Sequence, residues 1–259
     1  MTNMDQPVQI RHKRDSSIQL YAAILLTAII AAVGAIMMTI TSSPQMKGAA
    51  LLWIPAAMQL IAGVWFGPYK GFLVGGIGAY VAGIFAYGGW GLVDIIMNLI
   101  AGGFANSMLP GFLFRLLKIT PDFQAEPKDI QKALFIMVAL FILVIFVGLL
   151  PIFLKIGNVA YIIAALLLII GYPYILSGIK INKKDFFLGF VISILICGIS
   201  ALIGSFGVVI SGNTWEGALL GTGIGWWLGD TVSCFLGIYL LAYFTPLARE
   251  KGIFIDYLK

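Results

Sequence analysis

The sequence predicts an all-α integral membrane protein with about eight transmembrane helices. Of its 259 residues, 61% are hydrophobic and only 10% are charged, whereas soluble proteins carry roughly 25% charged residues. The mean hydropathy is +1.02. The chain also divides into eight apolar windows, and we interpret each of them as a membrane helix, which needs about 20 residues.

The eight windows follow one another with short polar connections. The predicted spans are 18–40, 48–65, 71–87, 91–117, 133–154, 158–177, 187–210 and 217–244. A basic tail, residues 1–17, precedes the first span, and a polar linker at 118–132 separates spans one to four (18–117) from spans five to eight (133–244). One membrane domain therefore covers residues 1–259, with a second tail at 245–259.

The positions of lysine and arginine predict the orientation, because cytoplasmic loops of membrane proteins are enriched in these residues. With both termini in the cytoplasm, 14 of the 16 basic residues lie inside, and only Lys47 and Lys155 lie outside. We therefore expect a multi-pass protein of the plasma membrane with both termini cytoplasmic. The sequence pI of about 9.2 follows from this asymmetry and does not indicate nucleic-acid binding.

Catalysis is the function class that the sequence favours least. The chain contains no phosphate-binding G-x-x-x-x-G-K-[ST] motif, no H-E-x-x-H motif and no G-x-S-x-G motif. Its single histidine, His12, lies in the basic tail, and Cys197 and Cys234 lie in apolar spans, where cysteines act as small hydrophobes. We expect neither a metal nor a cofactor.

Two short segments share the pattern G-W-x-L-x-D, at residues 89–94 and 225–230. A proline follows each aspartate sixteen residues later, at Pro110 and Pro246. This spacing predicts a parallel four-plus-four internal repeat, as transporters are known to have. In this interpretation Asp94 and Asp230 lie at the same outer depth, and the glycine-rich segment 218–225 forms a re-entrant or broken stretch.

The repeated segments predict a ligand-binding pocket that opens outward. Acids in apolar spans are costly and are therefore candidates for function, and residues four positions apart share a helix face. The predicted ligand-binding residues are Trp90, Asp94, Asn98, Trp226, Trp227 and Asp230. The alternative is structural: the acids begin helices, the tryptophans anchor the membrane interface, and Asn106 bridges two helices.

Small residues recur on one face of the first span. They are Ala23, Thr27, Ala31 and Ala35, with Ala28 and Ala32 as a neighbouring pair. Small side chains let two membrane helices approach closely. The partner is either another helix of this chain or a separate subunit.

Part of the first half resembles the substrate-binding (S) components of energy-coupling-factor transporters. The resemblance rests on W-I-P at 53–55, L-I-A-G-V-W-F-G-P-Y-K-G at 60–71 and G-G-I-G at 75–78. It implies uptake of a small water-soluble nutrient of the vitamin or cofactor-precursor type. It also implies a transmembrane coupling subunit, which would contact the small-residue face, and ATPases on separate chains.

The second half is similar to the eight-span membrane-associated sensor domain of bacterial signalling proteins. The similarity rests on W-W-L-G-D at 226–230 and T-P-L at 245–247. It implies an alternative function, a ligand-sensing membrane module. We expect such a module to signal through a separate partner protein, because no output domain follows Lys259. In either function the protein contacts membrane lipid and a small-molecule ligand.

Overall fold

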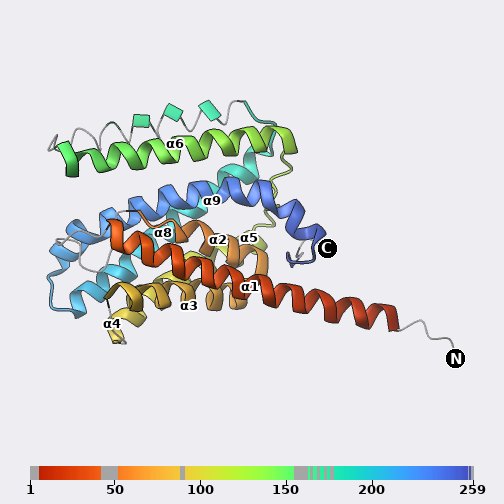
Figure 1. Cartoon of the computed structure of the whole chain (residues 1–259), viewed down its shortest axis with the longest axis horizontal. Helices are drawn as coiled ribbons and strands as arrows, with labels where there is room; N and C mark the ends of the chain where they lie inside the picture. The colour runs from red at the N-terminus through yellow and green to blue at the C-terminus, as the bar shows by residue number, and fades with distance from the viewer. Residues whose placement is uncertain are drawn as a thin grey trace.

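The computed structural model describes residues 6–41, 52–87, 91–154, 178–255 and 257, with isolated positions between 163 and 175. This described part of the chain is all-α (Figure 1). Its elements are α1 (Gln6–Thr41), α2 (Pro55–Phe66), α3 (Pro68–Tyr87), α4 (Leu92–Asp94), the π-helix η1 (Ile95–Met108), α5 (Leu109–Leu116), α6 (Pro127–Leu154), α8 (Lys183–Ile210), the π-helix η2 (Gly217–Gly223) and α9 (Ile224–Glu250). The predicted sixth span, 158–177, falls largely outside the described residues, as do Lys47, Lys155 and Trp90.

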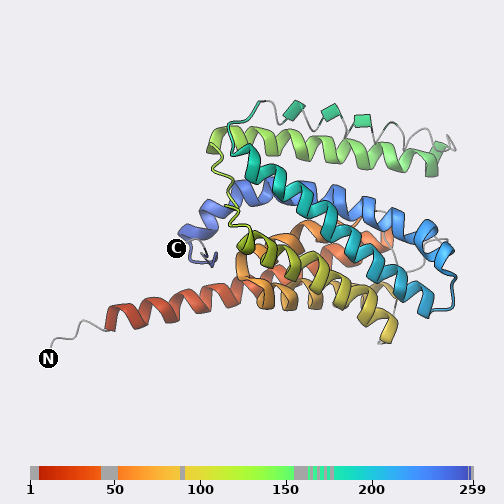
Figure 2. The ribbon, with the colours of Figure 1, turned by 180° about the vertical axis from the view of Figure 1, so that it is seen from behind.

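Four described helices are long and apolar enough to cross a membrane. They are Ser16–Thr39, Leu92–Leu116, Lys183–Ile210 and Gly217–Glu250. The last three run through the bundle, and Leu92–Leu116 and Gly217–Glu250 point in the same direction while Lys183–Ile210 points the opposite way (Figures 1 and 2). The all-α character that the composition predicts is therefore present, with four helices that could cross a membrane, and eight spans remain an expectation.

The second predicted span, 48–65, differs from the structure. The helix that corresponds to it, α2, begins only at Pro55 and has 12 residues, about 18 Å of helix against a hydrocarbon core of about 30 Å. Proline suits the first helical turn because it has no N–H to donate. At the other end Gly67 takes a φ of 87°, which only glycine adopts readily, and Pro68 opens α3.

The glycine-rich segment 218–225 is not the re-entrant or broken stretch that the sequence suggested. It is helical, and with α9 it forms one continuous helix, Gly217–Glu250, of 34 residues. The π-helical hydrogen bonds of η2 keep its backbone groups paired, as an apolar environment requires. The glycines of this segment therefore do not interrupt the helix.

Glycines allow α2, α3 and the η1–α5 helix to approach one another closely. A Cβ added at Gly63 of α2 would collide with the carbonyl oxygen of Ser107 in η1, and one added at Gly111 of α5 would collide with the carbonyl oxygen of Gly63. Gly71 of α3 meets Gly63 from the other side. Such small-residue contacts replace the hydrophobic effect as the basis of helix association in lipid.

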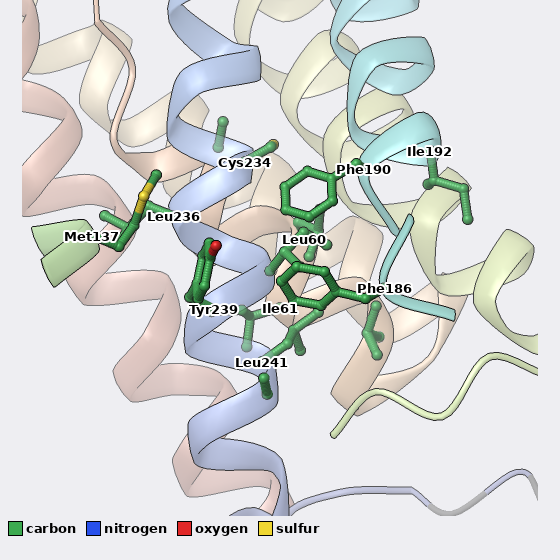
Figure 3. Close-up of a cluster of buried hydrophobic side chains, with 14 of the residues drawn as sticks. Leu60, Ile61, Met137, Phe186, Phe190, Ile192, Cys234, Leu236, Tyr239 and Leu241 are labelled. Atoms are coloured by element: carbon green, nitrogen blue, oxygen red, sulfur yellow. The ribbon is translucent and has the colours of Figure 1, made fainter. Parts of the chain in front are cut away.

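Aromatic side chains fill the contact between α8 and α9 near the beginning of α8 (Figure 3). The ring of Phe186 lies edge-on to Phe190 at 4.8 Å and to Tyr239 at 5.4 Å between ring centroids. Met137 of α6 packs with the same buried cluster from the opposite side of α9. Among the described elements, α6 packs against α9 alone, so it forms an outer layer above the bundle (Figures 1 and 2).

The first helix packs on α3 through part of its small-residue face. Gly34 of α1 lies against Ala82, and the carbonyl oxygen of Thr27 lies against Gly78. Ala23, Ala31 and Ala35 are partly buried, whereas Ala28 and Ala32 are exposed. A helix of this chain therefore covers one side of this face, and the side with Ala28 and Ala32 is uncovered by the described elements.

Polar contacts fasten the linker at 118–132 to the helix ends beside it. Asp185 accepts hydrogen bonds from the backbone N–H and the hydroxyl of Thr120, at 3.1 and 2.9 Å. Arg249, near the end of α9, pairs with Asp122 at 2.9 Å. These contacts place the beginning of α8 and the end of α9 at the same end of the bundle.

Candidate functional site

Asp230 lies at the centre of the bundle with only 1% of its surface exposed. It sits in α9, thirteen residues after the beginning of the continuous helix at Gly217. Its neighbours come from two other helices, η1 and α8, so three segments far apart in the sequence meet at this carboxyl group.

One oxygen of the Asp230 carboxyl group receives three hydrogen bonds. The side-chain amide of Asn106 donates to Oδ2 at 2.9 Å, the indole N–H of Trp226 at 3.1 Å and the hydroxyl of Ser200 at 3.4 Å. Trp226 precedes Asp230 by one helical turn, which puts both on one face as the spacing predicts.

Gln59 of α2 joins Asn106 and Asp230 in one polar cluster and extends it away from Asp230. Its Oε1 accepts from the same amide nitrogen of Asn106 at 3.1 Å and from the indole of Trp53 at 3.3 Å, and its Nε2 donates to the carbonyl of Gly75 at 3.2 Å. The hydroxyl of Ser107 donates to the backbone carbonyl of Gln59 at 2.8 Å. Asn106 therefore bridges helices, linking Gln59 to Asp230.

Glycines make room for the larger members of this cluster. A Cβ at Gly102 would approach the Gln59 amide nitrogen to 2.6 Å, and one at Gly75 would collide with the hydroxyl of Ser107. A Cβ at Gly204 would strike the ring of Trp226, and one at Gly34 would lie 2.6 Å from the ring of Trp53. The glycine-rich composition thus positions the polar and aromatic side chains of the site.

A small cavity lies beside Asp230. Met38, Trp53, Ala79, Met97, Asn98, Gly102, Asn106, Ser200, Trp226 and Asp230 line it. The space open to the centre of a water-sized group is about 20 Å³, and roughly 10–15 Å³ suffices for one water. In this conformation the cavity accommodates a group of that size.

Two buried oxygen atoms of the cavity lining have no hydrogen-bond partner among the described residues. They are Oδ1 of Asp230 and Oδ1 of Asn106. Buried acceptors without partners cost about 1–3 kcal/mol each, and more when charged. Both atoms belong to residues that line the cavity, and hydrogen-bond donors on a bound group would satisfy them.

Asp230 is also the only acidic or basic residue among the ten that line the cavity. Arg115, the cation of the same continuous helix as Asn106, is engaged elsewhere: its guanidinium donates to the carbonyls of Gly63, Val64 and Gly111. Buried acids are normally paired with a positive group. Among the described residues, none with a positive charge lines the cavity.

The structure brings together three of the six predicted ligand-binding residues. Asn98, Trp226 and Asp230 line the same cavity. Trp227 does not line it: its indole donates to the carbonyl of Ile194 at 2.9 Å and borders a separate apolar groove between α8 and η2. Trp90 lies outside the described residues.

Asp94 stands apart from the cavity, and the prediction of equal depth for Asp94 and Asp230 is wrong. Asp94 ends the short helix α4 and its Oδ2 accepts from the backbone N–H of Gly91 at 3.2 Å, which is the helix-start role of the structural alternative. Asp230 instead pairs with Asn106, about three helical turns further along the span from Asp94. The continuous helix that starts at Gly217 causes this offset.

Sequence reasoning did not single out Gln59, Trp53 or Ser200 as site residues. Gln59 is wholly buried and is the one amide side chain within the apolar helix α2. A polar residue inside an otherwise apolar segment is the signal that would have indicated it. Ser200 and Trp53 carry no comparable signal, because serine and tryptophan are common in membrane helices.

No protein-family model matches the chain, and no curated protein and no solved structure matches it. The resemblances to transporter and sensor families therefore rest on the short motifs in the sequence.

Proposed function

We propose that the protein is a membrane-embedded substrate-binding subunit for the uptake of a small water-soluble nutrient. The observation that carries the proposal is that two residues lining a cavity inside the helical bundle, Asp230 and Asn106, each have a buried Oδ1 without a hydrogen-bond partner among the described residues. An acid buried in an apolar bundle is costly to keep and is retained where it has a use.

The arrangement of helices supports a role in transport as well as in binding. The polar cluster joins α2, η1, α8 and α9 through side-chain hydrogen bonds. A ligand that replaces part of this hydrogen bonding changes how the four helices are held together. Binding can in this way be linked to a change in the surface that a coupling subunit contacts.

The proposal includes the orientation and the partners. Both termini lie in the cytoplasm of a plasma-membrane protein, as the asymmetry of basic residues indicates. A transmembrane coupling subunit packs on the uncovered side of α1, where Ala28 and Ala32 are exposed, and ATPases on separate chains supply the energy. The protein itself is not an enzyme in this proposal and binds no nucleic acid.

Native mass spectrometry of the gently purified complex tests this function. We expect a small molecule to remain bound and a coupling subunit with ATPases to accompany the chain. A bound molecule together with a kinase or cyclase in place of the ATPases would instead support the alternative function, a ligand-sensing module. Protein that carries neither ligand nor partner under conditions that preserve its fold would contradict the proposal.

A further inference from the structure

We infer that the ligand of the Asp230 cavity carries a small ammonium group with N–H donors, which binds between Asp230 Oδ1 and Asn106 Oδ1. This inference rests on the proposed function, because it names the chemical class of the ligand at the same site. Three properties of the cavity support it: its charge, its hydrogen-bonding capacity and the nature of its walls.

The charge of the cavity calls for a cation. Asp230 is buried and is the only acidic or basic residue among the described residues of the lining, and Arg115 is occupied with carbonyl groups of α2 and α5. Removing a charge from water without a partner is among the most costly events in a protein interior. A positive ligand group offsets that cost.

The hydrogen-bonding capacity of the cavity calls for a donor. Oδ2 of Asp230 already receives three hydrogen bonds, whereas Oδ1 receives none among the described residues. Asn106 donates through its nitrogen to both Gln59 and Asp230, which leaves its oxygen as an acceptor without a partner. The site thus offers two free acceptors and needs donors, and an ammonium group has up to three N–H donors beside its first carbon.

The walls of the cavity favour an ammonium group over a bare metal cation. Trp53 and Trp226 contribute indole rings, and Met38 and Met97 contribute thioethers. Indole faces attract organic cations, whereas hard cations such as calcium and magnesium require six or more oxygen ligands at close range. The cavity admits a water-sized group, which is the size of an ammonium headgroup.

Titration of the wild-type protein with simple salts tests this inference. Methylammonium chloride is the probe, with sodium chloride and tetramethylammonium chloride at equal ionic strength as controls, and calorimetry and thermal unfolding are the readouts. We expect saturable binding of methylammonium at least tenfold tighter than that of either control, because sodium has no N–H donors and tetramethylammonium has neither donors nor a fitting size. This comparison needs no variant and therefore does not depend on the folding of one.

Two variants locate the effect at the cavity. Asp230→Asn keeps the shape of the side chain and removes its charge, and we expect it to weaken methylammonium binding at least tenfold. Asp94→Asn makes the same chemical change at an acid of the same protein that does not line the cavity, and we expect it to leave binding unchanged.

The outcomes separate this inference from the proposed function. If a co-purified solute is present but methylammonium binds no better than sodium or tetramethylammonium, the ammonium class is wrong and the binding function stands. If neither a solute nor methylammonium binds, both are wrong. Equal methylammonium binding to the wild type and to Asp230→Asn would also overturn the inference, because the charge would then play no part.

Discussion

Asn106 and Asp230 lie 124 residues apart in the sequence, and the side-chain amide of Asn106 donates a 2.9 Å hydrogen bond to Oδ2 of Asp230. The same nitrogen donates to Gln59 of α2 at 3.1 Å. One amide group therefore ties the first half of the chain to the last helix. Among the described residues, the second oxygen of Asp230 and the side-chain oxygen of Asn106 have no hydrogen-bond partner.

Trp226→Phe tests the contribution of the indole N–H to the site. The variant keeps an aromatic ring beside Gly204 but removes the 3.1 Å donor to Oδ2 of Asp230. We expect solute binding to weaken by about tenfold, because a hydrogen bond to a charged group contributes about 1.5–3 kcal/mol and each 1.4 kcal/mol is tenfold. Trp227→Phe, next in the chain but outside the cavity lining, is the matched control and should bind as the wild type does.

The close helix contact at Gly63 predicts a stability effect that does not involve the site. A methyl group at this position would collide with the backbone of Ser107. We expect Gly63→Ala to lower the free energy of unfolding by about 1–3 kcal/mol, the usual cost of overpacking. Gly221→Ala is the control, because a Cβ at Gly221 meets no atom within 4 Å; it should leave stability unchanged or raise it. Thermal unfolding in detergent distinguishes these results, and equal melting temperatures for the two variants would contradict the packing described.

The short distance between the two cysteines leads to a prediction about the α8–α9 contact. Their sulfur atoms lie 3.5 Å apart, with Cys197 on α8 and Cys234 on α9, and both are buried. We expect the membrane-permeable oxidant diamide to convert the pair to a disulfide, with two hydrogens passing from the thiols to the diamide. Mass spectrometry should then show the loss of two hydrogens from the wild type and none from Cys234→Ser. Two thiols that stay free to alkylation after this treatment would show that the helices are held differently.

Topology is tested by labelling single cysteines in a background without Cys197 and Cys234. Cysteines placed at positions 47 and 213 should react with an impermeant reagent from outside, and those at 128 and 183 should react only from inside. The expected result follows from the asymmetry of basic residues. Position 47 lies outside the described residues, whereas the other three lie at or beside ends of α6, α8 and η2. External labelling at 128 would contradict the orientation.

The fold class was accessible from the sequence because composition alone excludes a soluble domain. The span boundaries were less accessible, and α2 shows why. The apolar window at 48–65 continues across Trp53 and Ile54, yet the helix begins at Pro55, and hydropathy does not register where a backbone changes direction. The same limit applies to 218–225, where abundant glycine indicated a break and the structure has π-helix.

Only part of the candidate site could be predicted, because sequence patterns report local properties of a helix and not which helices are neighbours. Asp230 stands out because a charge in an apolar span is conspicuous, and its four-residue spacing from Trp226 is a local property of a helix. The contacts with Asn106 and Ser200 depend on which helices are neighbours, and no local pattern encodes that. The repeat predicts the same role for Asp94 as for Asp230 because their segments are alike. Asp94, however, lies in the first turn of the continuous helix Leu92–Leu116, whereas Asp230 lies thirteen residues after the beginning of its own.

The central claim is that the Asp230 cavity is the binding site. The most direct test of this claim is to measure how much co-purified solute stays bound in two matched acid variants. Native mass spectrometry would give the bound fraction of the solute, and thermal unfolding would show whether each variant is folded. We predict that Asp230→Asn weakens solute binding by roughly ten- to a hundredfold, since about 1.5–3 kcal/mol is lost with a hydrogen bond to a charged group, and that Asp94→Asn binds as the wild type does. If Asp230→Asn instead retains wild-type occupancy while its melting temperature falls, Asp230 is a structural residue and the cavity is not the binding site.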